Sequence, residues 1–415
     1  MIDPFVLART VHFASVAMLS GLMFFLLFVA EPVVRRAIGG PDEAVTRLRR
    51  HLLGLGWATL GLSLLSGAAW LVLLAARLSG QPVAMAMSAG AVWKVLTETL
   101  FGTDFLARLV LAALLGGSLV RFDPVRGWRS WPDGVTAVLL AACFIGSLAW
   151  AGHGGARPGV AGDIQLAGDA LHLVAAGAWI GGLVPFVLVM AAARRLRNAT
   201  WNAVAAEVTV RFSGFAVVVV AGLLLTGLLN TWFLVGGLPS LVGTEYGRLL
   251  LIKIALAVAM VGLAAVNRLW LMPRLRQSPR QSDNVLGRLQ RNGLIETALG
   301  LAILGIVGAL GRTPPAAHTQ SLWPFPLRLS AAALDDPTSR KAALLTIAAA
   351  ACGAAAIVLG LAARRLRWPA LAAGVLIIAL AAAHLGLFTV AAFPTSFYAS
   401  PTDFSVHSIA AGEAL

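Results

Sequence analysis

Charge and cysteine are both scarce in this sequence of 415 residues. Only 12% of the residues are charged, against roughly 25% in soluble domains, while 59% are hydrophobic. The two cysteines, Cys143 and Cys352, both lie in apolar runs, which excludes a disulfide framework, a CxxC pair, a c-type haem motif and a zinc motif. So little charge is typical of a membrane protein. The net charge of +14 therefore has to be understood from its placement, and nucleic acid is not expected as a partner.

Motifs of the common enzyme classes are also missing. The sequence contains no P-loop, no GxSxG, no HExxH and no paired-carboxylate motif. An ATP-driven pump is thereby excluded. We expect a protein that is not an enzyme, with a redox role as the open alternative.

Long apolar segments recur along the chain. About 20 apolar residues are needed to cross roughly 30 Å of hydrocarbon. Such segments lie near residues 4–30, 52–76, 104–120, 135–152, 165–193, 208–235, 249–271, 293–311, 342–363 and 369–393. The sequence therefore predicts an all-α, polytopic membrane protein with about ten transmembrane helices in a lipid bilayer.

Lys and Arg are unequally distributed between the loops. The loops that follow the odd-numbered segments carry 20 of these residues, whereas the opposite set carries 8. By the positive-inside rule the richer set is cytoplasmic. Both termini are then predicted to lie outside the cytoplasm.

The first half of the chain resembles the second. The matching pairs are His12 with His172, Gly21 with Gly181, Ser66-Gly67 with Thr226-Gly227, and Gly102-Thr103-Asp104-Phe105 with Gly243-Thr244-Glu245-Tyr246. The repeat unit has four segments, an even number, so both copies share one orientation and a pseudo-twofold axis along the membrane normal is expected.

This duplication divides the chain into five parts. They are a first four-helix repeat (1–153), a second four-helix repeat (164–312), an outer loop (313–340), a two-helix addition (341–394) and an outer tail (395–415). The first repeat also carries extra residues in its second loop, including Met85 and Met87.

The second repeat carries the most distinctive motifs. They are Asp169-Ala-Leu-His172, Arg211-Phe-Ser, Thr226-Gly-Leu-Leu-Asn230, Tyr246-Gly-Arg-Leu-Leu-Leu-Ile-Lys253 and Asn267-Arg268. These motifs resemble the copper-resistance protein D family of bacterial inner-membrane proteins. The resemblance covers the first eight segments. It implies copper handling at the cytoplasmic membrane, periplasmic termini, and a periplasmic copper-binding protein or a cytochrome c as partner.

The tail of the chain carries a separate resemblance. Ser408-Ile-Ala-Ala-Gly-Glu-Ala-Leu415 is similar to the lead-in of the cytochrome c module found in fusions of this family. No CxxCH motif follows it in this sequence.

Four histidines are the main candidate ligands. At ~1.5 Å per residue, His12, His172 and His384 each lie about 12 Å below the outer surface, and His153 lies at the outer end of the fourth segment in Gly152-His-Gly-Gly. An imidazole in hydrocarbon needs a partner, and neutral imidazole is a common metal ligand. A hydrogen bond between helices is the alternative. The repeat-related positions of His12 and His172 favour ligation.

Three further residues complete the predicted metal site. Asp169, one helical turn before His172, could accept the ring N–H of a metal-bound imidazole, or it could be an interfacial carboxylate in water. Met85 and Met87 offer thioethers suited to Cu(I), although ordinary apolar residues fit that stretch as well.

Charged residues within the segments give three further expectations. Arg211 and Glu296 are predicted to pair near the cytoplasmic face, because either alone in hydrocarbon is costly. Asp104 with Arg108 and Glu245 with Arg248 are interpreted as helix-start pairs recurring in the two copies. Lys253 has no obvious partner.

Two functions from different classes follow. In the first, copper binds at an outer-leaflet site of His12, His153, His172 and His384, with Asp169, Met85 and Met87 as further ligands, and passes inward. In the second, two of His12, His172 and His384 ligate one b-type haem in a redox protein that exchanges electrons with a cytochrome c. The sequence leaves the oxidation state of copper and the energy source open.

Overall fold

The structure is a computed structural model that describes residues 3–38, 42–88, 90–152, 158–277, 282–319, 323–330, 332–362, 367–392 and 406–413. The chain divides into two compact units, Met1–Leu322 and Trp323–Leu415, which are described separately. The protein is an all-α, multi-pass membrane protein.

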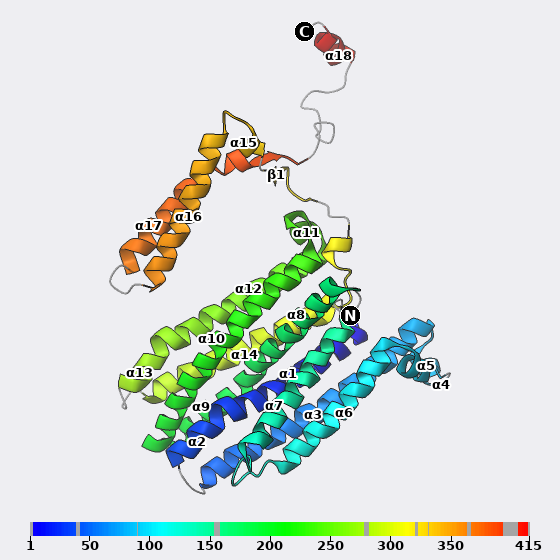
Figure 1. Cartoon of the computed structure of the whole chain (residues 1–415), viewed down its shortest axis with the longest axis vertical. Helices are drawn as coiled ribbons and strands as arrows, with labels where there is room; N and C mark the ends of the chain where they lie inside the picture. Colours follow the sequence, from blue (N-terminus) through cyan, green and yellow to red (C-terminus); the bar gives the residue numbers. More distant parts are fainter. Residues whose placement is uncertain are drawn as a thin grey trace. The chain divides into compact units, whose positions relative to one another are not determined.

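The first unit is a bundle of long apolar helices, coloured blue to yellow in Figure 1. Its long elements are α1 (Pro4–Phe25) with η1 (Leu26–Ala30) and α2 (Glu31–Ile38), α3 (Glu43–Ser79), α6 (Leu100–Arg121), α7 (Trp131–Gly146) with η2 (Ser147–Ala151), α8 (Val160–Ala176) with η4 (Gly177–Gly181) and α9 (Gly182–Leu196), α10 (Ala199–Val235), α12 (Glu245–Val266) with η5 (Asn267–Leu271) and α13 (Met272–Gln277), and α14 (Ser282–Leu310). Its short elements are α4 (Val83–Ser88), α5 (Ala91–Glu98), α11 (Leu238–Gly243) and η7 (Ala316–His318).

The second unit is a helical hairpin. Its elements are β1 (Leu327–Leu329), α15 (Ala332–Asp335), α16 (Arg340–Ala362), α17 (Arg367–Ala382), η9 (Leu385–Phe388), β2 (Thr389–Ala391) and α18 (Val406–Glu413). The two strands pair antiparallel. Gly353 and Gly374 let the backbones of α16 and α17 approach each other closely. The expected outer loop 313–340 is shared between the units, because η7 packs against α10, α11 and α12 of the first unit.

Nine helices in the described part of the chain are long and apolar enough to cross a membrane, and they coincide with the first nine predicted segments. The tenth prediction is wrong in length. Instead of a helix over 369–393, α17 has 16 residues, about 24 Å at ~1.5 Å per residue, and a 3-10 turn and a strand follow it. That length falls short of the roughly 30 Å of a hydrocarbon core.

The two halves of the first unit meet at glycines. A Cβ on Gly21 would collide with the backbone of Gly181, and a Cβ on Gly181 would collide with the carbonyl group of Ala17. Only glycine allows this approach. The contact lies at η4, a π-helical turn, so α1 and the segment from α8 to α9 touch through their backbones.

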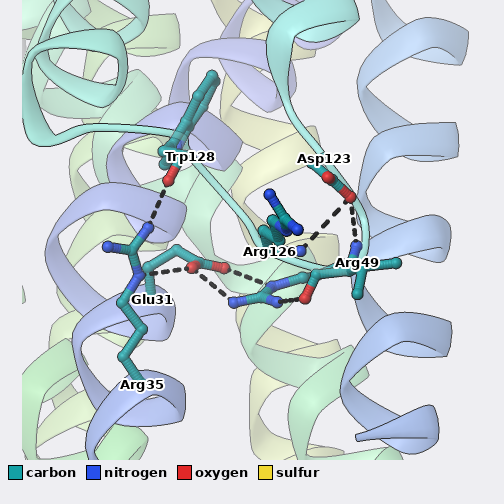
Figure 2. Close-up of polar contacts among 7 residues, drawn as sticks. Glu31, Arg35, Arg49, Asp123, Arg126 and Trp128 are labelled. Carbon is teal, nitrogen blue, oxygen red and sulfur yellow. Dashed lines mark hydrogen bonds and ion pairs between the residues drawn. The ribbon is translucent and has the colours of Figure 1, made fainter. Parts of the chain in front are cut away.

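Buried charged side chains connect α2, α3 and the loop between α6 and α7 at one end of the first half. Arg49 donates two hydrogen bonds to the Glu31 carboxylate, at 2.8 and 2.7 Å, and both side chains are buried. Figure 2 shows Arg35 on the other side of the same carboxylate. Arg49 also donates to the carbonyl of Val125, and Arg35 to that of Trp128. These bonds hold the loop between α6 and α7 against α2 and α3, and we call this group the Glu31 latch.

Gly127 makes room for the latch. Its φ of 76° lies in the left-handed region, and a Cβ there would collide with Oε2 of Glu31. The Asp123 carboxylate accepts hydrogen bonds from the backbone N–H groups of Val125 and Arg126 and shapes the same turn.

Candidate metal site: two histidine pockets

The two intramembrane histidines occupy equivalent positions. His12 on α1 contacts Ser66 on α3, and His172 on α8 contacts Thr226 on α10, each 54 residues further along the chain. The next residue after each contact, Gly67 or Gly227, leaves space for the imidazole ring. The matched contacts give each half one histidine pocket.

The His12 pocket uses both ring nitrogens. Nδ1 lies 2.9 Å from the carbonyl oxygen of Ser63, which can only accept, so this nitrogen carries the hydrogen. Nε2 then accepts from the Arg108 guanidinium at 3.3 Å. The ring is 3% exposed. Coordination of a metal by His12 therefore requires Arg108 to move.

Cations surround His12. Arg108 forms an ion pair with Asp104 at 2.6 Å. Arg9, three residues before His12, is also buried and has no acidic partner among the described residues; its guanidinium donates to Gly311 and lies 5.0 Å from the centre of the Trp70 ring. Two guanidinium groups against one carboxylate give this pocket an excess positive charge. Such a charge disfavours a metal cation.

Little space is open beside His12. The cavity that His12, Ser63, Gly67, Phe105 and Arg108 help to line has a volume of about 10 Å³, enough for about one water molecule. Pockets for organic ligands measure roughly 300–1,000 Å³. The pocket as it stands is closed to a haem.

The His172 pocket leaves one nitrogen available. Nδ1 lies 2.9 Å from the hydroxyl of Thr226, whose own hydrogen is donated to the carbonyl of Gly222 at 2.7 Å, so Nδ1 is the donor in the ring contact. The ring is also hydrogen bonded to the backbone of Leu223, which corresponds to Ser63 beside His12. Among the described residues, the hydrogen bond with a side chain uses Nδ1 and not Nε2. The side chain is half-buried. An oriented imidazole with a free lone pair is suited to bind a metal ion.

Of the two roles considered for Asp169, acceptance of the His172 ring N–H is not the one observed, because the ring contacts the hydroxyl of Thr226 and the backbone of Leu223. The Asp169 carboxylate is instead hydrogen bonded to Asn230 and interacts electrostatically with Lys253. Lys253, for which the sequence indicated no partner, also interacts electrostatically with His172. One carboxylate and one ammonium leave this pocket without excess fixed charge. Lys253 is a site residue that sequence reasoning missed.

The capping residues of α6 and α12 correct the predicted alignment of these helices. Thr99 accepts from the N–H of Gly102 and donates to the carbonyl of Val95. Thr244 makes the same two bonds with Gly247 and Ser240. Thr99 therefore corresponds to Thr244, one helical turn away from the sequence match that paired Thr103 with Thr244. In this alignment Arg108 corresponds to Lys253, so each histidine has a basic residue at the equivalent position.

The two rings do not share one site. Ala17 and Gly177 contact each other where α1 meets η4, and each comes five residues after its histidine. Five residues turn a helix by roughly 140° beyond one full turn, so each ring faces away from this contact and into its own half. A haem held between His12 and His172 is not compatible with these positions.

The remaining predicted ligands are in different places. Met85 and Met87 are exposed on α4, a short helix packed against α3. His384 follows α17 in the second unit and is exposed. His153 lies outside the described residues. No group of three or more His, Cys, Asp or Glu side chains able to hold a metal occurs within the described ranges.

The predicted pair of Arg211 and Glu296 is wrong. Arg211 lies 3.5 Å from Glu207, one turn earlier on α10. Glu296 accepts a hydrogen bond from Asn267 at 2.8 Å. Arg211 and Glu296 therefore have different partners and do not pair with each other.

A multi-pass, all-α membrane protein with a duplicated helical core and one histidine pocket in each half is the class that the fold and the site define. The family described as copper resistance protein D matches residues 206–310, and the family described as copper resistance protein D-like, N-terminal domain, matches residues 1–163. The chain belongs to the copper resistance protein D family.

Three relatives support this assignment. Copper resistance protein D of Pseudomonas syringae pv. tomato is 31% identical over 323 residues, 76% of this chain and 98% of the relative. Inner membrane protein YebZ of Escherichia coli (strain K12) is 30% identical over 307 residues, 74% and 97%. Copper transport protein CutJ of Bacillus subtilis (strain 168) is 28% identical over 76% of this chain and 54% of the relative. No solved structure matches the chain.

Proposed function

We propose that this protein handles copper at the cytoplasmic membrane, without an enzymatic reaction, by accepting a copper ion at His172 and moving it inward. Copper is the cargo here. The family membership supports the metal, and the unequal Lys and Arg content of the loops supports periplasmic termini.

The observation that carries the proposal is the free Nε2 of His172. Thr226 holds the ring in one orientation, and the ring is half-buried. Lys253 and Asp169 together add no excess charge, unlike the arginine-rich surroundings of His12. A site with one protein imidazole binds less tightly than a closed cage of ligands, and a transported ion must also be able to leave.

The inward direction is supported by one stripe that runs along α12 to the first residue of η5. Lys253, Met260 and Asn267 are spaced by seven residues, which returns to nearly the same helix face after two turns. Met260 is 1% exposed on a helix that is otherwise mostly exposed. Its thioether is a soft ligand suited to Cu(I), and it lies between the His172 pocket and Asn267. We propose Met260 as the next contact of the ion.

The donor in this proposal is a periplasmic copper-binding protein or a cytochrome c. Met85 and Met87 are exposed on α4, beyond the end of α3 where Arg77 contacts Asp3 next to the start of α1. Exposed thioethers there would be the first contacts with a donor that delivers Cu(I).

Copper content and uptake test the proposal. The full chain is purified, loaded with Cu(I) or Cu(II) in separate arms, and reconstituted into vesicles, and His172→Ala is compared with His318→Ala. His318 is an exposed histidine of η7, so the control also removes one imidazole. We expect His172→Ala to lose most bound copper and most uptake, and His318→Ala to keep both.

Equal copper binding by the wild type and His172→Ala would refute the site. A Soret band in the purified wild type that His172→Ala abolishes would instead establish the haem-binding alternative.

A further inference from the structure

Three polar side chains meet deep inside the second half of the bundle. Asn292 donates a hydrogen bond to Oδ1 of Asn267 at 2.6 Å, and Asn267 donates from Nδ2 to Oε1 of Glu296 at 2.8 Å. Asn292 and Glu296 are 6% and 3% exposed. Asn267 begins η5, a π-helical turn, and such turns often occur at functional sites. We call this group the Glu296 triad.

Glu296 lies at the middle of α14. Fourteen residues separate it from either end of this helix of 29 residues, so it lies about 21 Å from each end at ~1.5 Å per residue. Gly293 and Gly300, on the same helix, press against Val187 and Ile180. The carboxyl group is therefore surrounded by apolar packing on the side of α9 and η4.

No cation contacts the Glu296 carboxylate among the described residues. Five basic residues of α14 and of the elements packed against it are exposed, namely Arg195, Arg248, Arg274, Arg288 and Arg291. The other basic residues nearby have contacts elsewhere. Three of them pair with acidic residues: Arg108 with Asp104, Arg194 with Asp283 and Arg211 with Glu207. Arg9 donates to the carbonyl of Gly311, and Arg268 donates to the hydroxyl of Ser213. Lys253 interacts electrostatically with Asp169 and His172.

A carboxylate in this position needs neutralisation. An ionised carboxylate in an apolar interior is so costly that the group takes up a proton instead, unless a cation pairs with it. Asn267 occupies Oε1 and is a neutral donor. We propose that the Glu296 triad is a proton-binding site, with the proton on Oε2 of Glu296.

The orientation of the amides selects a proton over a metal ion. Hard cations such as Na⁺ bind through oxygens that point toward them. Here Asn267 turns its NH₂ group toward Glu296, and its oxygen is already occupied by Asn292. Cu(I) prefers sulfur and imidazole ligands over this set of oxygens.

The triad also bears on the proposed transport. Asn267 lies on the α12 stripe of Lys253 and Met260, so a proton leaving Glu296 would change the charge on the inward side of that stripe. This step rests on the proposed function. It predicts that uptake of copper depends on the proton gradient through Glu296, while binding of copper at His172 does not.

Infrared spectroscopy tests proton binding without copper. The purified full chain is titrated with acid and base, and the carbonyl band of protonated carboxyl groups is compared between the wild type, Glu296→Gln and Glu207→Gln. Glu207 is a more exposed glutamate on α10 that pairs with Arg211, and it serves as the matched control. We expect a band at neutral pH that Glu296→Gln removes, that Glu207→Gln keeps and that Asn267→Leu shifts.

The result that overturns the proposal is a wild-type spectrum at neutral pH identical to that of Glu296→Gln. A band that disappears on addition of Na⁺ would overturn it too, because the site would then bind a metal cation. Glutamine preserves the shape and neutrality of a protonated glutamate, so this variant is expected to fold. Retained copper binding in Glu296→Gln checks the fold and separates failure of this proposal from failure of the His172 site.

Discussion

The two halves of the bundle place a histidine in the same contact but differ in the charge around it. Three residues before the histidine, the first half has Arg9 and the second has Asp169. Four residues after the matched hydroxyl, the first half has Trp70 and the second has Asn230. The first pocket is therefore cationic and lined with aromatic rings, while the second is polar and balanced.

The two halves also differ in charge at the end of the bundle that carries Glu31 and Arg49. The Glu31 latch joins α2, α3 and the loop between α6 and α7 through buried charges. In the alignment that pairs the histidines, the second half has Ala191 and Thr209 in place of Glu31 and Arg49. The Thr209 hydroxyl is hydrogen bonded to the carbonyl of Ala205 and the sulfur of Met190. Duplication has thus produced one half fixed by charge and one half with a free imidazole.

The largest effect is expected from breaking the ion pair of the first pocket. Asp104→Ala leaves Arg108 buried and unpaired, which costs about 3–5 kcal/mol of unfolding free energy for buried pairs. The equivalent position in the second half is Leu249, where Leu249→Ala removes no charge. Unfolding of the detergent-purified variants would measure both. A loss for Asp104→Ala no greater than for Leu249→Ala contradicts the view that the first half is fixed by charge.

Removal of each histidine separates the two pockets directly. His172→Ala is expected to weaken copper binding by more than the roughly 10–100-fold that loss of an outer-shell partner costs, because a ligand is lost. His12→Ala should leave the affinity for copper within about threefold, since both nitrogens of His12 already have partners. Titration with copper gives both values. Equal losses would mean that the pockets act alike.

The hydroxyl partners offer a smaller and finer test. Thr226→Val removes the hydroxyl contact of the His172 ring at nearly constant volume and leaves the backbone of Leu223 as the remaining acceptor. Copper binding weaker by about tenfold, the lower end of the range for an outer-shell partner, is expected. Ser66→Ala is the matched change in the first half, where no effect on copper is expected, because Arg108 occupies Nε2 of His12 and this ring is not the proposed ligand. If Thr226→Val binds copper like the wild type, the orientation of the ring does not matter to the site.

The smallest effect is expected from Asp3, which precedes α1 and contacts Arg77 and Arg312. The backbone N–H of Phe5 and the guanidinium groups of Arg77 and Arg312 hold the pKa of Asp3 below its usual range. A lowered pKa means that the contribution to stability is complete above the ordinary pKa of the carboxyl and is lost as the pH falls through the lower folded value. Asp3→Asn should therefore lower the melting temperature slightly at neutral pH and not at all in strong acid. A difference that persists in acid contradicts this assignment.

Hydropathy and self-comparison predicted nine of the spans and the matched histidines, because the length of an apolar run and the identity of repeated residues are written directly in the sequence. The partners of the charges were harder to predict. Hydropathy predicted similar depths for Arg211 and Glu296, yet depth does not give the direction of a side chain, and each has its partner elsewhere.

The pairing of Arg108 with Lys253 was missed for a related reason. Gly-Thr followed by an acid occurs in both halves one helical turn out of register, and only the capping bonds of Thr99 and Thr244 fix the correct alignment. The short identical motif aligned Thr103 with Thr244, although Thr99 is the residue that makes the equivalent bonds. The division of roles between the pockets depends on both ring nitrogens, which no sequence pattern encodes.

The glycine contact between α1 and η4 has a mechanical consequence. Where two backbones touch without intervening side chains, neither helix can slide or rotate without steric collision, so this crossing acts as the fixed axle of the bundle. By contrast, α10 and α12 bury only 11% and 6% of their most apolar stretches inside the bundle. The two helices that carry Thr226 and Lys253 are therefore held by far fewer contacts than α1, and a change in the His172 pocket would meet least resistance there.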